Sequence, residues 1–254
     1  MNHKATAIKS VNFKLGILLV FICLLASCGE ERHAQKIVDR AIKAHGGANY
    51  QNLEMEFDFR NYHYRMKRQN GLFAYERIFT DTAGNHIEDK LNNDGFTRKI
   101  NGQEVSLTDE RKNAFSNSVN SVFYFALLPY GLNDPAVIKR LVGTTNIGGT
   151  AYHVVEVTFE EEGGGEDHTD VFYFWFRDDT YYMDYLAYTY ETEGGGVRFR
   201  EAINPRTIDG IRFQDFKNFK PQDKNTPLSA LENLYVNDEL ELLSIIELEN
   251  IETR

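Results

Sequence analysis

Cysteine is scarce in this sequence. Its 254 residues include two cysteines, Cys23 and Cys28, both near the N-terminus. The 226 residues that follow Cys28 (254 − 28 = 226) contain none, so they cannot form a disulfide bond. Their stability must come from a hydrophobic core. The chain is long enough for one, since a domain of this size buries roughly 70% of its unfolded surface.

Basic charge is also in short supply. The chain has 28 Lys and Arg against 38 Asp and Glu, a formal net charge of −10. This balance argues against a nucleic-acid partner, which requires basic surfaces. There are only five prolines and no low-complexity linker, which favours a single domain after the N-terminal segment.

Recognisable catalytic patterns are absent from the sequence as well. It has no nucleophile elbow, no P-loop and no HExxH motif. The seven histidines never stand four residues apart, and the carboxylates are too numerous to single out an acid–base pair. We therefore expect no cofactor and no metal ion, and we favour a non-enzymatic role.

The N-terminal segment has the pattern of an export signal. Lys4, Lys9 and Lys14 precede an apolar run over 15–25, which is shorter than the roughly 20 residues of a membrane span. The run ends in Leu-Ala-Ser-Cys at 25–28, which resembles the lipobox of bacterial lipoproteins. We expect a signal peptide over 1–27, a lipid on Cys28 and a linker over 28–33. The alternative is an ordinary secretory signal that happens to contain a cysteine.

Removal of this signal makes the chain more acidic. It removes three lysines and no acid, so 25 basic residues face 38 acidic ones and the mature net charge is −13 (28 − 3 = 25; 25 − 38 = −13). Electrostatic adhesion to anionic lipids is therefore not expected, and the acyl anchor would be the membrane link. Gly29-Glu30-Glu31 resembles a surface-export tag, or it begins a solvated linker. We expect an outer-membrane location, on either side.

Hydrophobic periodicity predicts two helices and many strands. A helix over 34–45 ends at Gly46-Gly47, with His45 as a capping or packing residue, and a second helix over 108–128 has Thr108 as N-cap. From residue 53 the period is two, and a slip of phase near Arg60-Asn61 predicts a bulge or bend within a continuous strand. Further strands are expected at 73–79, 86–90, 97–100, 153–160, 170–177, 181–191, 197–203, 211–219 and 240–249.

The late strands read as an antiparallel meander. Counting reversals places the glycine triplets 163–165 and 194–196 at the same end of one sheet. A polar rim is expected there, made of Glu166, Asp167, His168, Asp170, Arg198 and Arg200. It would bind a cation or a polar head group, or, as we favour, form two solvated hairpins whose charges pair locally.

The many aromatic residues on the predicted strands suggest an apolar cavity beneath the helices. Phe172, Phe174 and Phe176 share one face of a strand whose other face is also apolar, so both faces should be covered. The alternative is that these aromatic side chains fill the core and leave no cavity. The candidate cavity residues are Phe57, Phe59, Tyr64, Phe73, Tyr75, Phe172, Phe174 and Phe176, with Phe115, Val119 and Phe123 as a lid.

Several stretches resemble known families. Residues 36–47 resemble the first helix of lipoprotein-sorting proteins of the LolA/LolB type, and 209–213 resembles their late Gly-x-x-Pro hairpin, although Gln214 replaces the proline. Residues 128–137, 163–168 and 194–202 are similar to an uncharacterised family of Bacteroidota lipoproteins. The resemblance implies a mainly β (α+β) fold, a single antiparallel, incomplete β-barrel over 34–254 wrapped around a few helices, with a hydrophobic cavity.

Three functions remain open at this point. The first is a membrane-anchored, non-enzymatic carrier or sensor of an apolar ligand such as a lipid or acyl chain. The second is a protein-interaction module, in the periplasm or on the cell surface, without a ligand. The third is a hydrolase that uses the acidic rim near Glu166–Asp170. The sequence names neither a ligand nor a protein partner.

Overall fold

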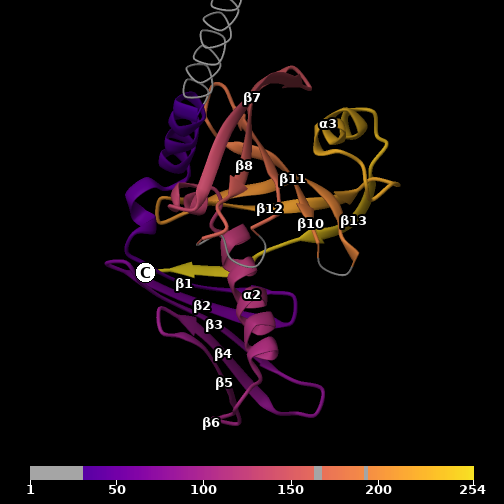
Figure 1. The fold of residues 1–254 in the computed structure, drawn as a ribbon. Helices are drawn as coiled ribbons and strands as arrows, with labels where there is room; N and C mark the ends of the chain where they lie inside the picture. The colour runs from indigo at the N-terminus through magenta and orange to yellow at the C-terminus, as the bar shows by residue number, and fades with distance from the viewer. Residues whose placement is uncertain (1–30, 163–167, 192–193) are drawn as a thin grey trace, which may run out of the picture.

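The computed structural model describes residues 31–162, 168–191 and 194–254. Within these residues the strands form two seven-stranded antiparallel sheets (Figure 1). The first sheet has the order β14-β1-β2-β3-β4-β5-β6, and the second has the order β13-β12-β11-β10-β9-β8-β7. The strands of the first sheet are β1 (Leu53–Phe59), β2 (Tyr62–Gln69), β3 (Leu72–Thr80), β4 (His86–Asn92), β5 (Gly95–Ile100), β6 (Gln103–Glu104) and β14 (Glu249–Thr253).

The second sheet is built from the C-terminal half of the chain. Its strands are β7 (Val137–Ile147), β8 (Thr150–Phe159), β9 (Phe172–Arg177), β10 (Met183–Tyr190), β11 (Gly196–Ile208), β12 (Ile211–Lys220) and β13 (Glu241–Ile246). The helices are a first helix over residues 31–45, α2 (Asp109–Ala126) and α3 (Leu228–Val236), with 3-10 turns η1 (Gly47–Tyr50) and η2 (Tyr130–Asn133). No helix in the described part of the chain is long and apolar enough to span a membrane.

The two sheets are joined at a seam. β13 is the edge of the second sheet and β14 the edge of the first, and only residues 247 and 248 lie between them. Asp215 fixes this seam by accepting hydrogen bonds from Arg206 Nη2 (3.0 Å) and from the Leu248 amide (3.0 Å). Among the described residues no pairing joins β6 to β7, so the barrel is open. The predicted fold class, a mainly antiparallel and incomplete barrel, is confirmed.

Each sheet has a helix packed on its inner face, and the second sheet has another helix on its outer face. Val119 and Phe123 of α2 pack beneath the first sheet, where the Phe123 ring stacks 4.3 Å from that of Tyr75. The first helix packs on one face of the second sheet, against Phe174, and α3 packs on the other, against Trp175. The strand with two apolar faces is therefore covered on both sides, as predicted. The structure has three hydrophobic cores, and their described residues all lie between Ala34 and Ile251.

The helix predictions were largely correct. The first helix begins by residue 31 and ends at 45, and α2 lies within the predicted 108–128. The Thr108 side chain accepts a hydrogen bond from the Arg111 amide at 3.4 Å, as expected of an N-cap. The nine-residue helix α3 was not predicted.

Three strand predictions were wrong. Arg60 and Asn61 form a two-residue turn between β1 and β2, not a bulge, and Arg60 takes a left-handed φ of 57°. A two-residue turn brings Phe57 opposite Tyr64, so the phase slip keeps both rings on the same face. Residues 137–147, which were left without a strand, form β7. The single strand expected over 240–249 is two strands in different sheets.

Candidate ligand-binding site

A pocket of about 390 Å³ lies where α2 meets the seam between the sheets. We call it the α2 pocket. Its residues come from the end of β1 and the β1–β2 turn, from β2 and β3, from one face of α2, and from β11 to β13 with Leu248. The apolar part of its wall includes Phe59, Val122, Phe125, Ala126, Phe216, Ile246 and Leu248. No Asp or Glu lines it, as far as the described residues go.

The position of α2 explains its share of the pocket. Ser118, Val122 and Phe125 stand at i, i+4 and i+7, so they lie along one face of the helix. The neighbouring face, with Val119 and Phe123, is fully buried under the first sheet. The pocket therefore forms beside the core contact of α2, where the helix crosses from one sheet toward the other.

Arg77 is one polar residue of the pocket wall, and it is paired with a carboxylate behind the wall. It donates from Nε and Nη2 to the buried Asp89 at 3.0 and 2.6 Å, and from Nη1 to Ser118 Oγ at 2.8 Å. Arg98 also donates to Asp89, at 2.5 and 2.9 Å. One carboxylate thus serves two guanidinium groups, and these three side chains together keep one positive charge.

Arg200 also lines the pocket, and it has no carboxylate among its described hydrogen-bond partners. Its side chain lies over the Phe125 ring, with Cζ 4.1 Å from the ring centre, and Nη2 donates to Tyr188 Oη at 2.7 Å. Its Nε is buried without a hydrogen-bond partner. Burial lowers the pKa of this guanidinium, and the positive charges of Arg198 and Arg60 lower it further.

The predicted cavity residues are divided between two cores. Phe59 and Tyr64 line the α2 pocket. Phe57, Tyr75, Val119 and Phe123 are buried in the core under the first sheet, with Phe73 and Phe115 partly buried against it. Phe172, Phe174 and Phe176 belong to the core under the second sheet. These nine side chains belong to the two hydrophobic cores.

The predicted polar rim is only partly described. Glu166, Asp167 and the first glycine triplet lie outside the described residues. The pairs Phe172 with Tyr188 and Tyr190 with Gly196 place the β8–β9 and β10–β11 connections at the same end of the second sheet. In that part of the second sheet His168 is half-buried, Asp170 is buried, and Arg198 donates to the Val197 carbonyl at 2.9 Å.

Arg200 is the exception among the predicted rim residues, because its side chain lines the α2 pocket. Within the described ranges, no group of three or more His, Cys, Asp or Glu side chains has the arrangement of a metal site.

Sequence reasoning missed most of the α2 pocket. It did not select Arg60, Arg77, Val122, Phe125 or Phe216, all of which line it. The available signal was the helical spacing of Val122 and Phe125, which places both side chains on one side of the helix. The remaining wall residues come from segments far apart in the sequence, and periodicity does not show that they meet.

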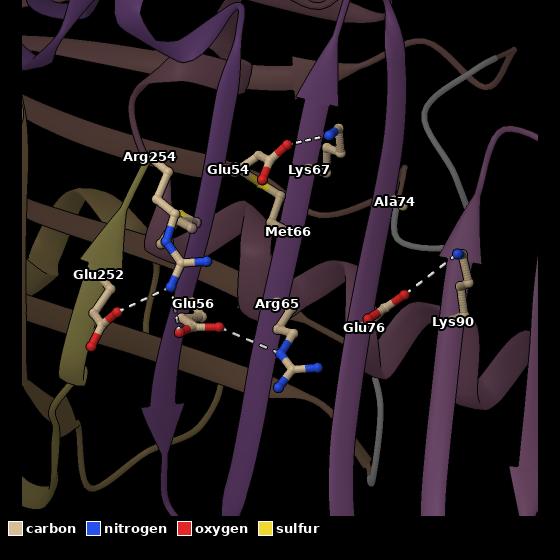
Figure 2. A pocket seen from close by; sticks show the side chains of 11 residues that line it. Glu54, Glu56, Arg65, Met66, Lys67, Ala74, Glu76, Lys90, Glu252 and Arg254 are labelled. Carbon is tan, nitrogen blue, oxygen red and sulfur yellow. Dashed lines mark hydrogen bonds and ion pairs between the residues drawn. The ribbon is translucent and has the colours of Figure 1, made fainter. Parts of the chain in front are cut away.

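A larger hollow, of about 590 Å³, lies on the outer face of the first sheet (Figure 2). Its charges are matched across the strands: Lys67 pairs with Glu54, Arg65 with Glu56 at 3.4 Å, and Lys90 with Glu76 at 3.4 Å. Arg254 pairs with Glu252 at 3.4 Å and with Glu56 at 3.5 Å. Such exposed pairs are typical of a solvated sheet face, so the α2 pocket is the better candidate site.

Fold and pocket together define the class of protein: an open, two-sheet antiparallel β-structure with an amphipathic pocket beside its covering helix. Residues 14–249 match the model of DUF6503, a family of unknown function, and the chain belongs to that family. No curated protein matches the chain.

Solved structures with a similar arrangement share little sequence with this chain. One is a LolA superfamily protein from Nitrosomonas europaea, at 11% identity and a TM-score of 0.48, covering 87% of this chain and 93% of that one. Another is a DUF1329 family protein from Desulfovibrio piger, at 12% identity and a TM-score of 0.46, covering 86% and 92%. Similarity at this level does not transfer a function.

Proposed function

We propose that this protein is a lipid-anchored envelope protein that binds an apolar or amphipathic small molecule in the α2 pocket, without catalysis. The observation behind the proposal is the pocket itself. Its volume of about 390 Å³ lies within the range of small-molecule sites, roughly 300–1,000 Å³. Its wall combines aliphatic and aromatic side chains with a few polar groups, as in most such sites.

The driving force for binding would be burial of apolar ligand surface. Transfer of such surface from water contributes about 25 cal/mol per Å². Phe59, Val122 and Phe216 come from three different elements, so a ligand between them would be covered from several sides. A pocket fixed by α2 and two sheets is also largely preformed, which reduces the entropy lost on binding.

The anchor is the second part of the proposal. It rests on the resemblance of residues 25–28 to a lipobox and on the apolar run before it. A lipid on Cys28 would hold the folded part, which begins by residue 31, close to a membrane. The outer membrane of a bacterial envelope is the proposed location.

Fluorescent fatty-acid displacement and native mass spectrometry test the ligand-binding part. The protein would be the chain from residue 29, which contains every described core residue. We expect the wild type to bind the fluorescent fatty acid and to release it when an unlabelled fatty acid competes. We expect Val122→Trp to lose this binding, because the indole would fill the pocket. Val142→Trp, at an exposed position on β7, is the matched control. Equal binding of the fluorescent fatty acid by both variants would contradict the proposal.

A second candidate, the interaction module, has one observation in its favour. Leu242, Leu243 and Ile245 on β13 are 50%, 44% and 44% exposed, on the edge strand of the second sheet. An exposed apolar edge can pair with a strand from a partner protein. If Leu243→Lys abolished binding of a partner protein and Val122→Trp left that binding intact, this second candidate would replace the first.

A further inference from the structure

We infer that the α2 pocket selects a single-chain amphiphile with an anionic head group, carboxylate or phosphate, and that Arg200 binds this head. The inference rests on the proposed function, since it names the class of ligand for the same pocket. It follows from the surroundings of Arg200, from the charge of the pocket wall and from the size of the pocket.

Arg200 is a buried cation whose hydrogen bonds are incomplete. Only 8% of the residue is exposed, yet of its three side-chain nitrogens only Nη2 has a described hydrogen-bond partner, the Tyr188 hydroxyl at 2.7 Å. Its Nε is buried without an acceptor, and burying an N–H group in this way is unfavourable. An anion in the pocket would supply the missing acceptors.

The same fold shows how a purely structural arginine is treated. Arg77 and Arg98 are also largely buried, and both donate to the fully buried Asp89. Such a carboxylate accepts hydrogen bonds from each planar guanidinium and offsets part of their combined charge. No carboxylate among the described residues takes this role for Arg200, although the chain contains 38 acidic residues.

Like charges gather where repulsion would normally exclude them. Arg60 and Arg77 line the pocket with Arg200, and the positive charge of Arg198 also acts on Arg200. The pocket wall is thus positive in a protein whose net charge is −10. A positive site in an acidic protein favours anions over neutral ligands of the same shape.

The dimensions restrict the tail to one chain. The pocket is near the lower end of the usual size range, and apolar residues such as Phe216, Ile246 and Leu248 adjoin the arginines. Arg200 itself stacks on Phe125, so head-binding and tail-binding surfaces meet at one point. A ligand with one alkyl chain and a terminal anion matches this arrangement.

Three probes of equal chain length test the inference: dodecanoate, dodecyl phosphate and dodecanol. We expect the chain from residue 29 to bind one or both anions at least tenfold more tightly than the alcohol, since each hydrogen bond to a charged group contributes strongly. The tighter anion identifies the head group. In Arg200→Met the advantage of the anions over dodecanol should be lost.

Two further variants keep the outcomes distinct. Arg65→Met, on the exposed face of the first sheet, should leave the anion preference unchanged, and Arg200→Lys, which keeps the charge, should retain part of it. Equal binding of anions and alcohol by the wild type would overturn this inference while leaving the proposed function intact. If none of the three probes bound, the proposed function itself would fail. Loss of dodecanol binding in both Arg200 variants would make Arg200 a packing residue and overturn the inference.

Discussion

His45, the last residue of the first helix, should make stability depend on pH. The side chain is completely buried, its Nδ1 lies 2.8 Å from the Ala41 carbonyl, and the Met183 amide donates to its Nε2 at 3.4 Å. These contacts require a neutral ring with the proton on Nδ1. A second proton on Nε2 would face an N–H donor, near the positive charge of Arg212.

The magnitude follows from the pKa. Burial lowers the pKa of His45 from 6.5 to about 4, and Arg212 acts in the same direction. Because the unfolded chain then binds this proton at a higher pH than the folded one, the contribution of His45 is fully present above about pH 6.5. It is lost as pH falls toward 4. Between pH 7.5 and pH 4.5 this linkage amounts to about 2.5 kcal/mol of unfolding free energy.

Urea denaturation of the wild type and of His45→Gln, at pH values from 7.5 to 4.5, measures this effect. The variant should be the less stable protein at pH 7.5, because it loses buried contacts, and its deficit should shrink as the pH falls. Taking the difference between the two proteins removes the contribution of the carboxylates. A constant difference between the two proteins across this pH range would refute the reasoning.

Two other variants test the polar core and the anchor. Asp89→Asn leaves two buried guanidinium groups without a counter-charge and should lower the unfolding free energy by about 3–5 kcal/mol, whereas Glu76→Gln in an exposed pair should cost less than about 1 kcal/mol. Equal losses in urea denaturation would contradict this account of Asp89. Cys28→Ala should leave the protein soluble or uncleaved in cell fractionation, while Cys23→Ala, within the predicted signal, should leave it membrane-bound and processed. A mature, membrane-bound Cys28→Ala protein would refute the anchor.

Local signals in the sequence predicted the elements that depend on few residues. Thr108 and the apolar spacing that follows it were sufficient for α2, since capping and periodicity are properties of one segment. The alternation over 53–59 gave β1 for the same reason. The turn at Arg60-Asn61 was misread because a bulge and a two-residue hairpin produce the same phase slip. Only the pairing partner distinguishes them, and pairing is not local.

The pocket depended on information that the sequence pattern does not contain. Periodicity separates inward from outward positions, but it does not show whether inward side chains fill the available space. Phe57 and Phe123 pack against each other, with ring centres 5.7 Å apart, whereas Phe59, two residues along the same strand, lines a pocket. The difference arises from the seam at Leu248, where the last strands change sheets.

The stability of the ligand-free protein offers an independent check on Arg200. If Arg200 has a structural role, Arg200→Met should destabilise the protein as other losses of buried contacts do. If it is kept for a ligand, the ligand-free variant should be as stable as wild type or more stable, because an apolar side chain of similar length replaces an incompletely paired buried charge. The long stem of methionine keeps contact with Phe125, which the guanidinium now covers. A loss of more than about 2 kcal/mol in urea denaturation would therefore favour the structural role, whereas equal or greater stability together with loss of anion preference would be explained only by the binding role.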